Sequence, residues 1–398
     1  MRSMSDPRAR RFLIILGVVA ALAIFTSTMS KNPALPLLAA SIGASDAQVG
    51  LISAISPIPG ILVSSFAGAY SDRKGRSKVI TLSLLIFASA PFFYLFVTDL
   101  WQLAAVRFYH GFATAIFMPV AMAAVADRYP SSLRGQALGT YSSFTMAGRF
   151  IAPFLGGALI FYASFGSLYL LCGITAIVAL ALSLLVPWDD GDTIAKAKKF
   201  SGSMLSALKE VVQERKIMVT SSMEGVQYFA MGAFEAFLPL YARSLGFNAL
   251  DIGAIMGVQV VSMLLFKPLM GRVSDQKGRV PMIVIGLILG AVAMFLMPLT
   301  SNILLLAILS IAFGLTVAMV TASTSALVTE IAGSSAHGSA IGVLSSVMDI
   351  GHSVGPLITG IVVGAISFLA GFGLAAALLV VGAALFALEM RGPIRTKA

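Results

Sequence analysis

One stripe of polar residues stands out in a chain that is 58% hydrophobic and only 11% charged. Glu224, Gln227, Tyr228, Met231 and Glu235 are spaced so that they share one face of an α-helix. Two acids, an amide and a phenol are costly against lipid, so we expect this face to line a polar cavity. A carboxyl in such a low-dielectric site takes up a proton more readily than in water. The stripe predicts proton binding at Glu235; for Glu224 an interfacial acid without a role is the alternative.

A second pair of ionisable residues lies near the carboxyl end of the chain. Asp349 and His352 are three residues apart, so they stack on one helical face. An imidazole changes its charge near a pH of about 6.5, and a neighbouring carboxylate keeps it charged longer. We expect both to meet Glu235 and Arg149 at mid-depth and to take part in proton coupling. A structural ion pair among these four residues is the alternative.

A buried cationic position is predicted in the segment "LAAVRFYHG". Arg107, His110 and Thr114 share one helical face. An arginine in the middle of a membrane costs about 2.5–3.5 kcal/mol on insertion scales, so it must face water, protein or substrate. We place these three residues in a substrate cavity with Lys31 and Asn32, which end the first apolar segment. A structural arginine bonded to backbone carbonyls is the alternative for Arg107.

Enzymatic and metal-dependent chemistry is not indicated. The chain has one cysteine and three histidines, and we find no GxSxG, HExxH or Walker sequence. We therefore predict no cofactor, no metal site and no enzyme activity. Covalent turnover by the purified protein would contradict this prediction.

The elements that must position these residues are long apolar segments. About 20 helical residues span a hydrocarbon core of about 30 Å, and lipid offers no partner for free backbone groups, so such segments must be helices. The fold class predicted is an all-α membrane protein with twelve transmembrane helices. The segments are roughly 12–40, 48–70, 78–97, 101–126, 136–161, 165–187, 218–242, 250–270, 280–299, 302–329, 339–363 and 366–389.

The net charge of +10 does not indicate nucleic-acid binding, because the basic residues are divided among short loops. Most of them fall in the two termini and in alternate loops, while the intervening loops are poor in them. This is the positive-inside pattern, and it predicts a multi-pass protein of the plasma (inner) membrane with both termini cytoplasmic. Its surroundings are the lipid bilayer, and we expect a monomer.

The two halves of the chain repeat one plan at an offset of 203 residues. "GAYSDRKGRS" at 68–77 corresponds to "GRVSDQKGRV" at 271–280. Matching positions farther along include Pro36 and Pro239, Gly111 and Gly314, Asp127 and Glu330, and Pro153 and Pro356. Six helices per copy is an even number, so both copies enter the membrane from the same side. We predict an amino-terminal six-helix bundle (1–187), a cytoplasmic linker (188–217) and a carboxyl-terminal six-helix bundle (218–398).

The repeated loop resembles the signature loop of the major facilitator superfamily. Its glycines allow a tight turn, and its aspartate can face the positive end of a helix. The resemblance implies that Asp72 and Arg76 latch the halves together on the cytoplasmic side. The predicted latch comprises Gly68, Asp72, Arg73, Gly75 and Arg76, and in the second copy Gly271, Asp275, Gly278 and Arg279.

Two further segments resemble phrases of the same superfamily. "AGRFIAPFLGG" and "IGHSVGPLITG" carry small residues one helical turn apart, which allows backbones to pack closely, and a proline within each. We assign helix packing to Gly148, Pro153, Gly157, Gly351, Gly355 and Pro356. The first phrase resembles the motif of the antiport branches, which favours export.

Together these features predict a secondary transporter that works by alternating access between two halves. The favoured function is proton-coupled efflux of small amphipathic compounds, resembling the drug:proton antiporter branch. The alternative is transport of small organic anions such as carboxylates, bound by Arg107, Arg149, His352 and Lys31. A channel is a third class, which uphill movement on a proton gradient would exclude.

Overall fold

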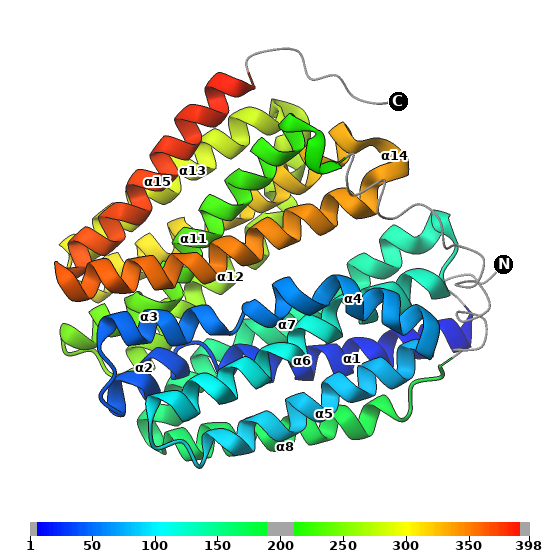
Figure 1. Ribbon diagram of the computed structural model, residues 1–398, viewed down its shortest axis with the longest axis horizontal. Coiled ribbons are helices and arrows are strands. Elements are labelled where there is room, and N and C mark those ends of the chain that lie inside the picture. Colours follow the sequence, from blue (N-terminus) through cyan, green and yellow to red (C-terminus); the bar gives the residue numbers. More distant parts are fainter. Residues whose placement is uncertain (1–5, 189–210, 391–398) are drawn as a thin grey trace. The chain divides into compact units, whose positions relative to one another are not determined.

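The computed structural model describes residues 6–188 and 211–390, and the regular elements in these two ranges are helices (Figure 1). Most of the predicted linker 188–217 lies outside the described residues. The elements are α1 (Pro7–Met29), α2 (Ala34–Ser41), α3 (Asp46–Ile55), α4 (Ile58–Lys74), α5 (Arg76–Tyr94), α6 (Leu100–Arg128), α7 (Ser131–Tyr162), α8 (Phe165–Ser183), α11 (Arg215–Ser244), α12 (Ala249–Lys277), α13 (Arg279–Leu296), η1 (Met297–Leu299), α14 (Ile303–Ala365) and α15 (Phe368–Glu389).

Eleven segments of the described chain are long and apolar enough to cross a membrane. Two of them form the single element α14, which is interrupted at Gly333, where φ is +71°. Helix α11 is not among the eleven, although its 30 residues are long enough to span. Its hydropathy is lowered by the polar stripe that includes Glu224, Gln227 and Glu235. The all-helical membrane fold predicted from the sequence is confirmed.

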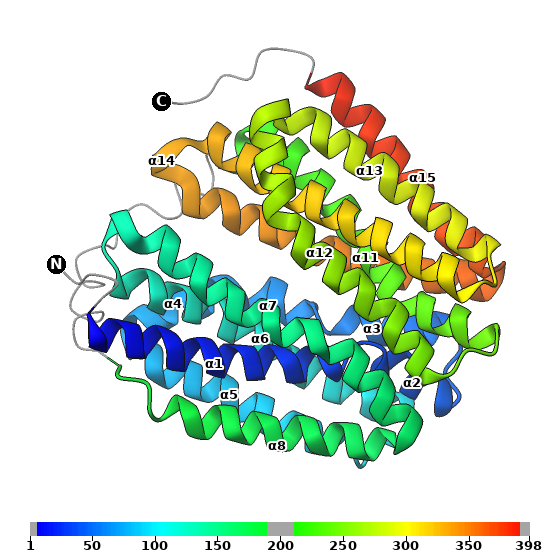
Figure 2. The same cartoon turned by 180° about the vertical axis from the view of Figure 1, so that it is seen from behind.

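The helices fall into two compact units. In unit 1, α1 packs on α7 and α8, while α5 packs on α6 and α8 (Figure 1). In unit 2, α14 is central and contacts α11, α12 and α13, with α15 against α13 (Figure 2). Each unit therefore has its own core of helix-on-helix packing.

The two units do not correspond to the first and second halves of the sequence. Unit 1 comprises residues 1–35 and 58–201, and unit 2 comprises residues 36–57 and 202–398. The segment 36–57 belongs to unit 2 because α3 packs along the second half of α14. At this crossing a side chain at Gly50 would collide with the backbone of Pro356 and Gly360. The boundaries predicted at 188 and 217 stay a prediction.

The repeat reappears in the turns that begin and end the helices. Gly43 and Gly246 have φ values of +86° and +89°, and Gly75 and Gly278 have values of +98° and +95°. These pairs are 203 residues apart, and glycine adopts such values without steric cost. The tight turns expected of Gly75 and Gly278 are thus present in both copies.

Glycines also let helices approach closely within each unit. A side chain at Gly148 of α7 would collide with the carbonyl of Ala21 in α1. In unit 2, Gly351 of α14 meets the carbonyl of Gly225 in α11, and Gly355 meets that of Phe229. Pro153 and Gly157 are buried in α7, and Pro356 contacts Gly232 of α11. All six residues assigned to helix packing are therefore buried in helix interfaces or in the interior of their unit.

Candidate functional site

A histidine and a carboxylate meet in the interior of unit 2. Nε2 of His352, on α14, lies 2.9 Å from Oε2 of Glu235, on α11. Their side chains are 18% and 11% exposed. The ring of Tyr228 meets the His352 ring nearly edge-on, with centroids 5.7 Å apart. Asp349 lies one turn before His352 on α14 and is half-buried. Two of the predicted proton-coupling residues are thus in direct contact.

The polar stripe of α11 does not have one set of neighbours. Glu224 accepts a hydrogen bond of 2.5 Å from Oγ1 of Thr324 on α14. Met231 accepts one from Nε2 of Gln259 on α12, at 3.7 Å. Tyr228 and Glu235 instead contact His352. The stripe is therefore divided between the core of unit 2 and the histidine.

Two partners of Glu224 were not among the predicted site residues. Thr324 is fully buried, and its hydroxyl also contacts the carbonyl of Val320 at 2.9 Å. Lys267, on α12, is close enough to interact with the charge of Glu224. The lysine lies near the end of the predicted apolar segment 250–270, a position that suggests an interfacial residue from sequence alone, whereas the observed helix continues to Lys277. The sequence could not identify Thr324 as a partner of Glu224, because threonine is common in membrane helices and its position along the chain does not show which residue it contacts.

Gln227 is fully buried next to this group, one turn along α11 from Glu224. Neither the oxygen nor the nitrogen of its amide has a hydrogen-bond partner among the described residues, and the same holds for the hydroxyl of Thr321. Thr321 lies one turn from Thr324 on α14. Polar groups that are buried without partners are rare in proteins and call for a ligand, a water or a change of conformation.

The interior of unit 1 contains a buried arginine, whereas that of unit 2 contains the acids Glu224 and Glu235. Arg107, on α6, is 2% exposed, and its Nη1 donates to the hydroxyl of Tyr94 on α5 at 3.1 Å. The same hydroxyl lies 3.5 Å from Nδ1 of His110, which is 3% exposed. Tyr94 stacks on Tyr169 of α8, with centroids 4.3 Å apart. Tyr94 and Tyr169 were not among the predicted residues, because aromatic residues are frequent in the core of any helical bundle.

The other residues predicted to line a substrate cavity lie elsewhere in unit 1. Thr114 is half-buried, and its hydroxyl is 3.2 Å from that of Ser27 on α1. Lys31 is half-buried and Asn32 is buried in the turn that follows α1. Arg149 is exposed on α7. Their common role in a cavity stays a prediction.

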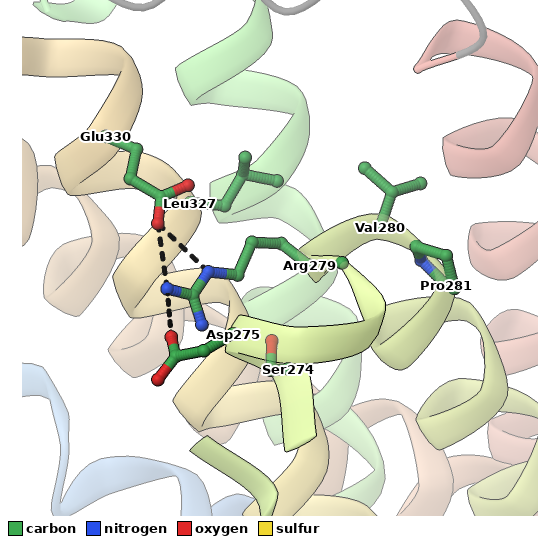
Figure 3. Close-up of a pocket in the computed structure, with 8 residues that line it drawn as sticks. Ser274, Asp275, Arg279, Val280, Pro281, Leu327 and Glu330 are labelled. Carbon is green, nitrogen blue, oxygen red and sulfur yellow. Dashed lines mark hydrogen bonds and ion pairs between the residues drawn. The ribbon is translucent and has the colours of Figure 1, made fainter. Parts of the chain in front are cut away.

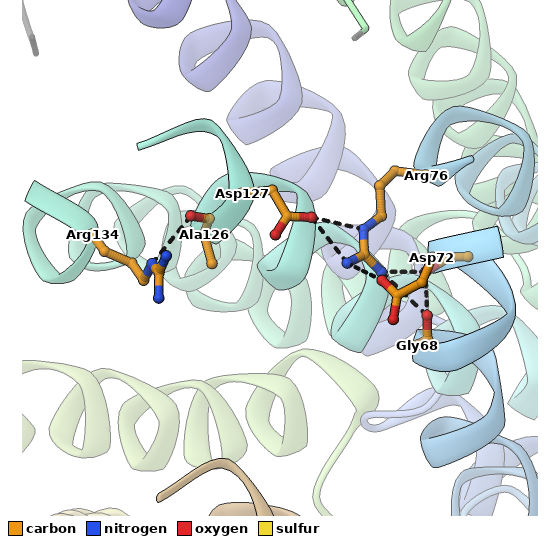
Figure 4. Close-up of polar contacts among 7 residues, drawn as sticks. Gly68, Asp72, Arg76, Ala126, Asp127 and Arg134 are labelled. Carbon is orange, nitrogen blue, oxygen red and sulfur yellow. Dashed lines mark hydrogen bonds and ion pairs between the residues drawn. The ribbon is translucent and has the colours of Figure 1, made fainter. Parts of the chain in front are cut away.

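The first copy of the repeated loop forms a charge cluster around Arg76 (Figure 4). Its guanidinium donates to Oδ2 of Asp127, on α6, from Nε at 3.1 Å and from Nη2 at 2.9 Å. It also pairs with Asp72 and donates to the carbonyl of Gly68 at 3.2 Å. The Arg76 side chain is 9% exposed, whereas both acids are 42% exposed. Arg76 therefore ties α4, α5 and α6 together.

The second copy forms the same cluster around Arg279 (Figure 3). Its guanidinium donates to Oε1 of Glu330, on α14, at 3.0 Å from Nε and 2.8 Å from Nη2, and it pairs with Asp275. The cluster borders a cavity of about 560 Å³ that Val280, Pro281 and Leu327 also line. The Arg279 side chain is 17% exposed, about twice the fraction of Arg76.

Each cluster is built from residues of one unit, the first from unit 1 and the second from unit 2. Arg73 is exposed, and Gly68 and Gly271 have nothing within 4 Å of the position that a Cβ would occupy. The contacts within each unit explain why aspartate, glycine and arginine recur at these spacings. A role of these residues as a latch between the halves stays a prediction.

Two helical bundles with buried ionisable residues and matched charge clusters define a polytopic transport protein. The sequence pattern of the Major Facilitator Superfamily matches residues 16–251 and 220–398. The chain belongs to this superfamily, and it is a membrane transporter, not an enzyme.

Several proteins with related sequences are named as multidrug resistance or efflux proteins. The chain is 25% identical over 351 residues to "Multi-drug resistance efflux pump PmrA homolog" of Lactococcus lactis subsp. lactis, which covers 84% of both chains. It is 26% identical over 371 residues to "Multidrug resistance protein MdtG" of Klebsiella pneumoniae, covering 91% of this chain and 89% of the relative.

Solved structures share the fold at low sequence identity. A bacterial homolog of the human lysosomal transporter Spinster, in an inward-facing conformation, superposes with a TM-score of 0.81 at 16% identity, covering 97% of this chain and 98% of the other. A point mutant of the nucleoside transporter NupG superposes with a TM-score of 0.84 at 15% identity, covering 96% of this chain and 100% of the other. These similarities show the fold.

Proposed function

We propose that this transporter exports small amphipathic compounds in exchange for protons, and that the pair Glu235 and His352 carries the coupling proton. The observation on which this rests is the 2.9 Å contact between the imidazole and the carboxylate in the interior of unit 2. Both side chains are ionisable, and they belong to helices that the 203-residue repeat relates to α1 and α7. Asp349, one turn away, and the buried Glu224 are the further acids of the proposed proton path.

The chemistry of the pair suits a proton-for-substrate exchange. With a proton on the imidazole, the two groups attract each other, and the pair is neutral overall. A cationic group that approaches Glu235 competes with the imidazolium for the carboxylate, and the imidazole is then free to release its proton. Tyr228 packs against the His352 ring and restricts its orientation. Substrate binding and proton loss would thereby be linked at one carboxylate.

The relatives support export over import. PmrA and MdtG are described as multidrug resistance or efflux proteins, and the alignments cover more than four fifths of this chain. A substrate class that is broad and amphipathic fits the many methionine and phenylalanine residues, 19 and 26 in number, because such side chains adapt to different ligands. The proposed substrate cavity includes Lys31, Asn32, Arg107, His110, Thr114, Arg149, Gln227, Tyr228 and Met231.

The remaining features of the proposal concern the protein in its membrane. The clusters around Arg76 and Arg279 act as a latch between the halves on the cytoplasmic side, where both termini lie. The first copy has Arg73 where the second has Gln276, so the latch is unequal. The working unit is a monomer in the plasma (inner) membrane.

Transport of small organic anions is the second candidate, and one observation favours it. Arg149 is exposed near the middle of α7 and forms no ion pair with any residue that the structure describes. A charged guanidinium at this depth does not face lipid, so it faces water or a ligand. A negatively charged substrate would supply the missing partner.

The test uses proteoliposomes with an imposed pH gradient and a pH-sensitive dye inside. Cationic, neutral and anionic compounds are added to wild type, to Glu235→Gln and to the exposed-site control Arg134→Gln. The proposal predicts that cationic or neutral compounds move protons in wild type and in the control but not in Glu235→Gln. Proton movement by anions alone supports the second candidate. Unchanged coupling in Glu235→Gln would contradict the role of the pair.

A further inference from the structure

Among the residues that the structure describes, the buried cation of unit 1 has no acidic partner. Arg107 is 2% exposed, and its guanidinium donates to the neutral hydroxyl of Tyr94, at 3.1 Å. No carboxylate in the described part of the chain pairs with it. The guanidinium therefore carries a full positive charge in an apolar bundle. A buried charge is normally paired or bound to an ion.

The hydrogen bonds of this group determine which atoms are left over. A guanidinium only donates, so the Tyr94 oxygen accepts from Arg107. The Tyr94 oxygen can accept a second hydrogen bond from His110, or its own proton can point to Nδ1 of His110, 3.5 Å away. The inference rests on the second arrangement, in which Nδ1 is the acceptor nitrogen of a neutral ring and the His110 proton resides on Nε2. Among the residues that the structure describes, neither this nitrogen nor Nε of Arg107 has a hydrogen-bond partner.

In this arrangement both unsatisfied atoms are donors, and both residues lie on one face of α6. They call for an acceptor, and the positive charge of Arg107 favours a negative one. Water could accept the two hydrogen bonds, but it would leave the charge uncompensated. The rings of Phe87 and Tyr94 meet the His110 ring edge-on, and Tyr169 stacks on Tyr94, so aromatic side chains border this group.

We propose that Arg107, with His110, binds a small inorganic anion of the halide or nitrate class inside unit 1. The anion takes the place of a carboxylate that the chain does not provide there. It accepts from Nε of Arg107 and Nε2 of His110, while Tyr94 fixes the geometry of both side chains. This site is separate from the proposed proton pair, because Glu235 and His352 belong to unit 2. Arg107 and His110 also belong to the proposed substrate cavity, and the binding test below does not require transport.

The test is equilibrium dialysis of the purified full chain against radiolabelled chloride, after exchange into a gluconate buffer. The expected result for wild type is one chloride per chain, displaced by bromide and nitrate but not by gluconate or acetate. Displacement by acetate would instead assign the site to carboxylates and overturn the inorganic class. Absence of specific chloride binding would overturn the proposal.

Variants connect the bound anion to the named residues. Arg107→Met should weaken chloride binding by about tenfold or more, since it removes the charge and the donor together. His110→Phe keeps a ring in the same space and should weaken binding by roughly fivefold. If Arg107→Met does not fold, as judged by size-exclusion chromatography, His110→Phe provides the test. The matched control Arg134→Gln, at an exposed arginine of the same unit, should bind as wild type does. Equal chloride binding in His110→Phe and wild type would contradict the site.

Discussion

The two units share their charge clusters but differ in their interiors. Arg76 bonds Asp72 and Asp127, and Arg279 bonds Asp275 and Glu330, through the same arginine nitrogens and at the same sequence spacing. In the described part of unit 1, the buried Arg107 pairs with no acid, whereas unit 2 holds Glu224 and the pair of Glu235 with His352. A duplicated fold kept the interactions that hold its turns, and its interior acquired opposite charges. We place the specialised chemistry in the interiors, where the two units differ.

The close approach of helices should be equally essential in both units. A side chain at Gly148 would overlap the carbonyl of Ala21, and one at Gly351 would overlap that of Gly225. We expect Gly148→Leu and Gly351→Leu each to cost about 3 kcal/mol or more, since overpacked backbone contacts cannot relax easily. The measurement is the yield of monodisperse protein and its unfolding temperature.

Glycines in open positions provide the control for this experiment. Gly68 and Gly271 have no atom near the position of an added Cβ. Gly68→Ala and Gly271→Ala should leave the unfolding temperature unchanged or raise it slightly, because alanine favours a helix by up to about 1 kcal/mol over glycine. A stable Gly351→Leu protein would show that the α11–α14 contact is looser than described.

The two arginine clusters should differ in strength. Arg76 is more buried than Arg279 and has the carbonyl of Gly68 as an additional acceptor. We expect Arg76→Ala to destabilise the protein by about 2–4 kcal/mol and Arg279→Ala by about 1–2 kcal/mol, because removing the cation leaves two acids unpaired. Thermal unfolding in detergent measures both. Equal effects would show that burial does not distinguish the copies.

We expect lysine to be a poor replacement for either arginine. Each guanidinium uses two nitrogens on one carboxylate and a further contact on another acid. An ammonium group lacks this forked geometry. Arg76→Lys should therefore recover less than half of the stability that Arg76→Ala loses, whereas substitution of the exposed Arg73 by alanine should have no measurable effect.

Variants that affect the two acids of α11 should change different properties: loss of the Glu224 contact should lower stability, and loss of the Glu235 charge should abolish proton coupling. Thr324→Val removes the donor to the buried Glu224 and should cost about 1–3 kcal/mol, since a buried carboxyl loses its hydrogen bond. Glu235→Gln keeps the size of the side chain and its contact with His352, so we expect a smaller loss of stability but a loss of coupling. Unfolding temperature and proton movement are measured on the same preparations. If Thr324→Val uncouples transport without unfolding, Glu224 belongs to the proton path more directly than Glu235.

The smallest predicted effect is a pH dependence at the first charge cluster. Burial raises the pKa of Asp72 above its ordinary value of 3.8, and this outweighs the opposing effect of the Arg76 guanidinium. The folded protein thus binds this proton more tightly than the unfolded chain. The contribution to stability is present at low pH and is lost as the pH rises through the raised pKa.

Asp72→Asn tests this sign. The variant should lose part of the decline in unfolding temperature that wild type shows as the pH rises through the titration of Asp72, a change of well under about 1 kcal/mol because the side chain is partly exposed. The control is Asp99→Asn, an exposed acid at the start of α6. A steeper decline in Asp72→Asn than in wild type would mean that the ion pair with Arg76 dominates the titration.

The repeat made much of the fold predictable from the sequence. A constant offset of 203 residues related Gly75 to Gly278 and Asp127 to Glu330, and the structure shows both pairs in equivalent roles. Sequence comparison did not reveal that Asp127 and Glu330 are the partners of the loop arginines. These contacts join residues 51 positions apart, and spacing along a helix carries no information on such distant partners.

The polar stripe shows where helical periodicity stops being informative. At about 100° per residue, Tyr228 and Glu235 are rotated to one side of Glu224, and Gln227 and Met231 to the other. The structure places the first two against His352 and the others in the core of unit 2. A helix with several neighbours divides one stripe between them. The face was predictable from the sequence, whereas the neighbours were not.

The grouping of residues 36–57 with unit 2 was not predictable either. It depends on α3 packing along α14, where Gly50 meets Pro356 and Gly360. Small residues are common throughout this chain, which has 37 glycines. Their spacing indicates that helices can approach closely but does not identify which helices do so.

The central claim is that the pair of Glu235 and His352 exchanges a proton for substrate. The most direct measurement is proton release on substrate binding by purified protein in weakly buffered detergent solution with a pH-sensitive dye. The compound is one that moves protons in the liposome assay. We predict release of about one proton per protein from wild type and from Arg134→Gln, and none from Glu235→Gln or His352→Gln. Undiminished proton release from both variants would contradict the claim.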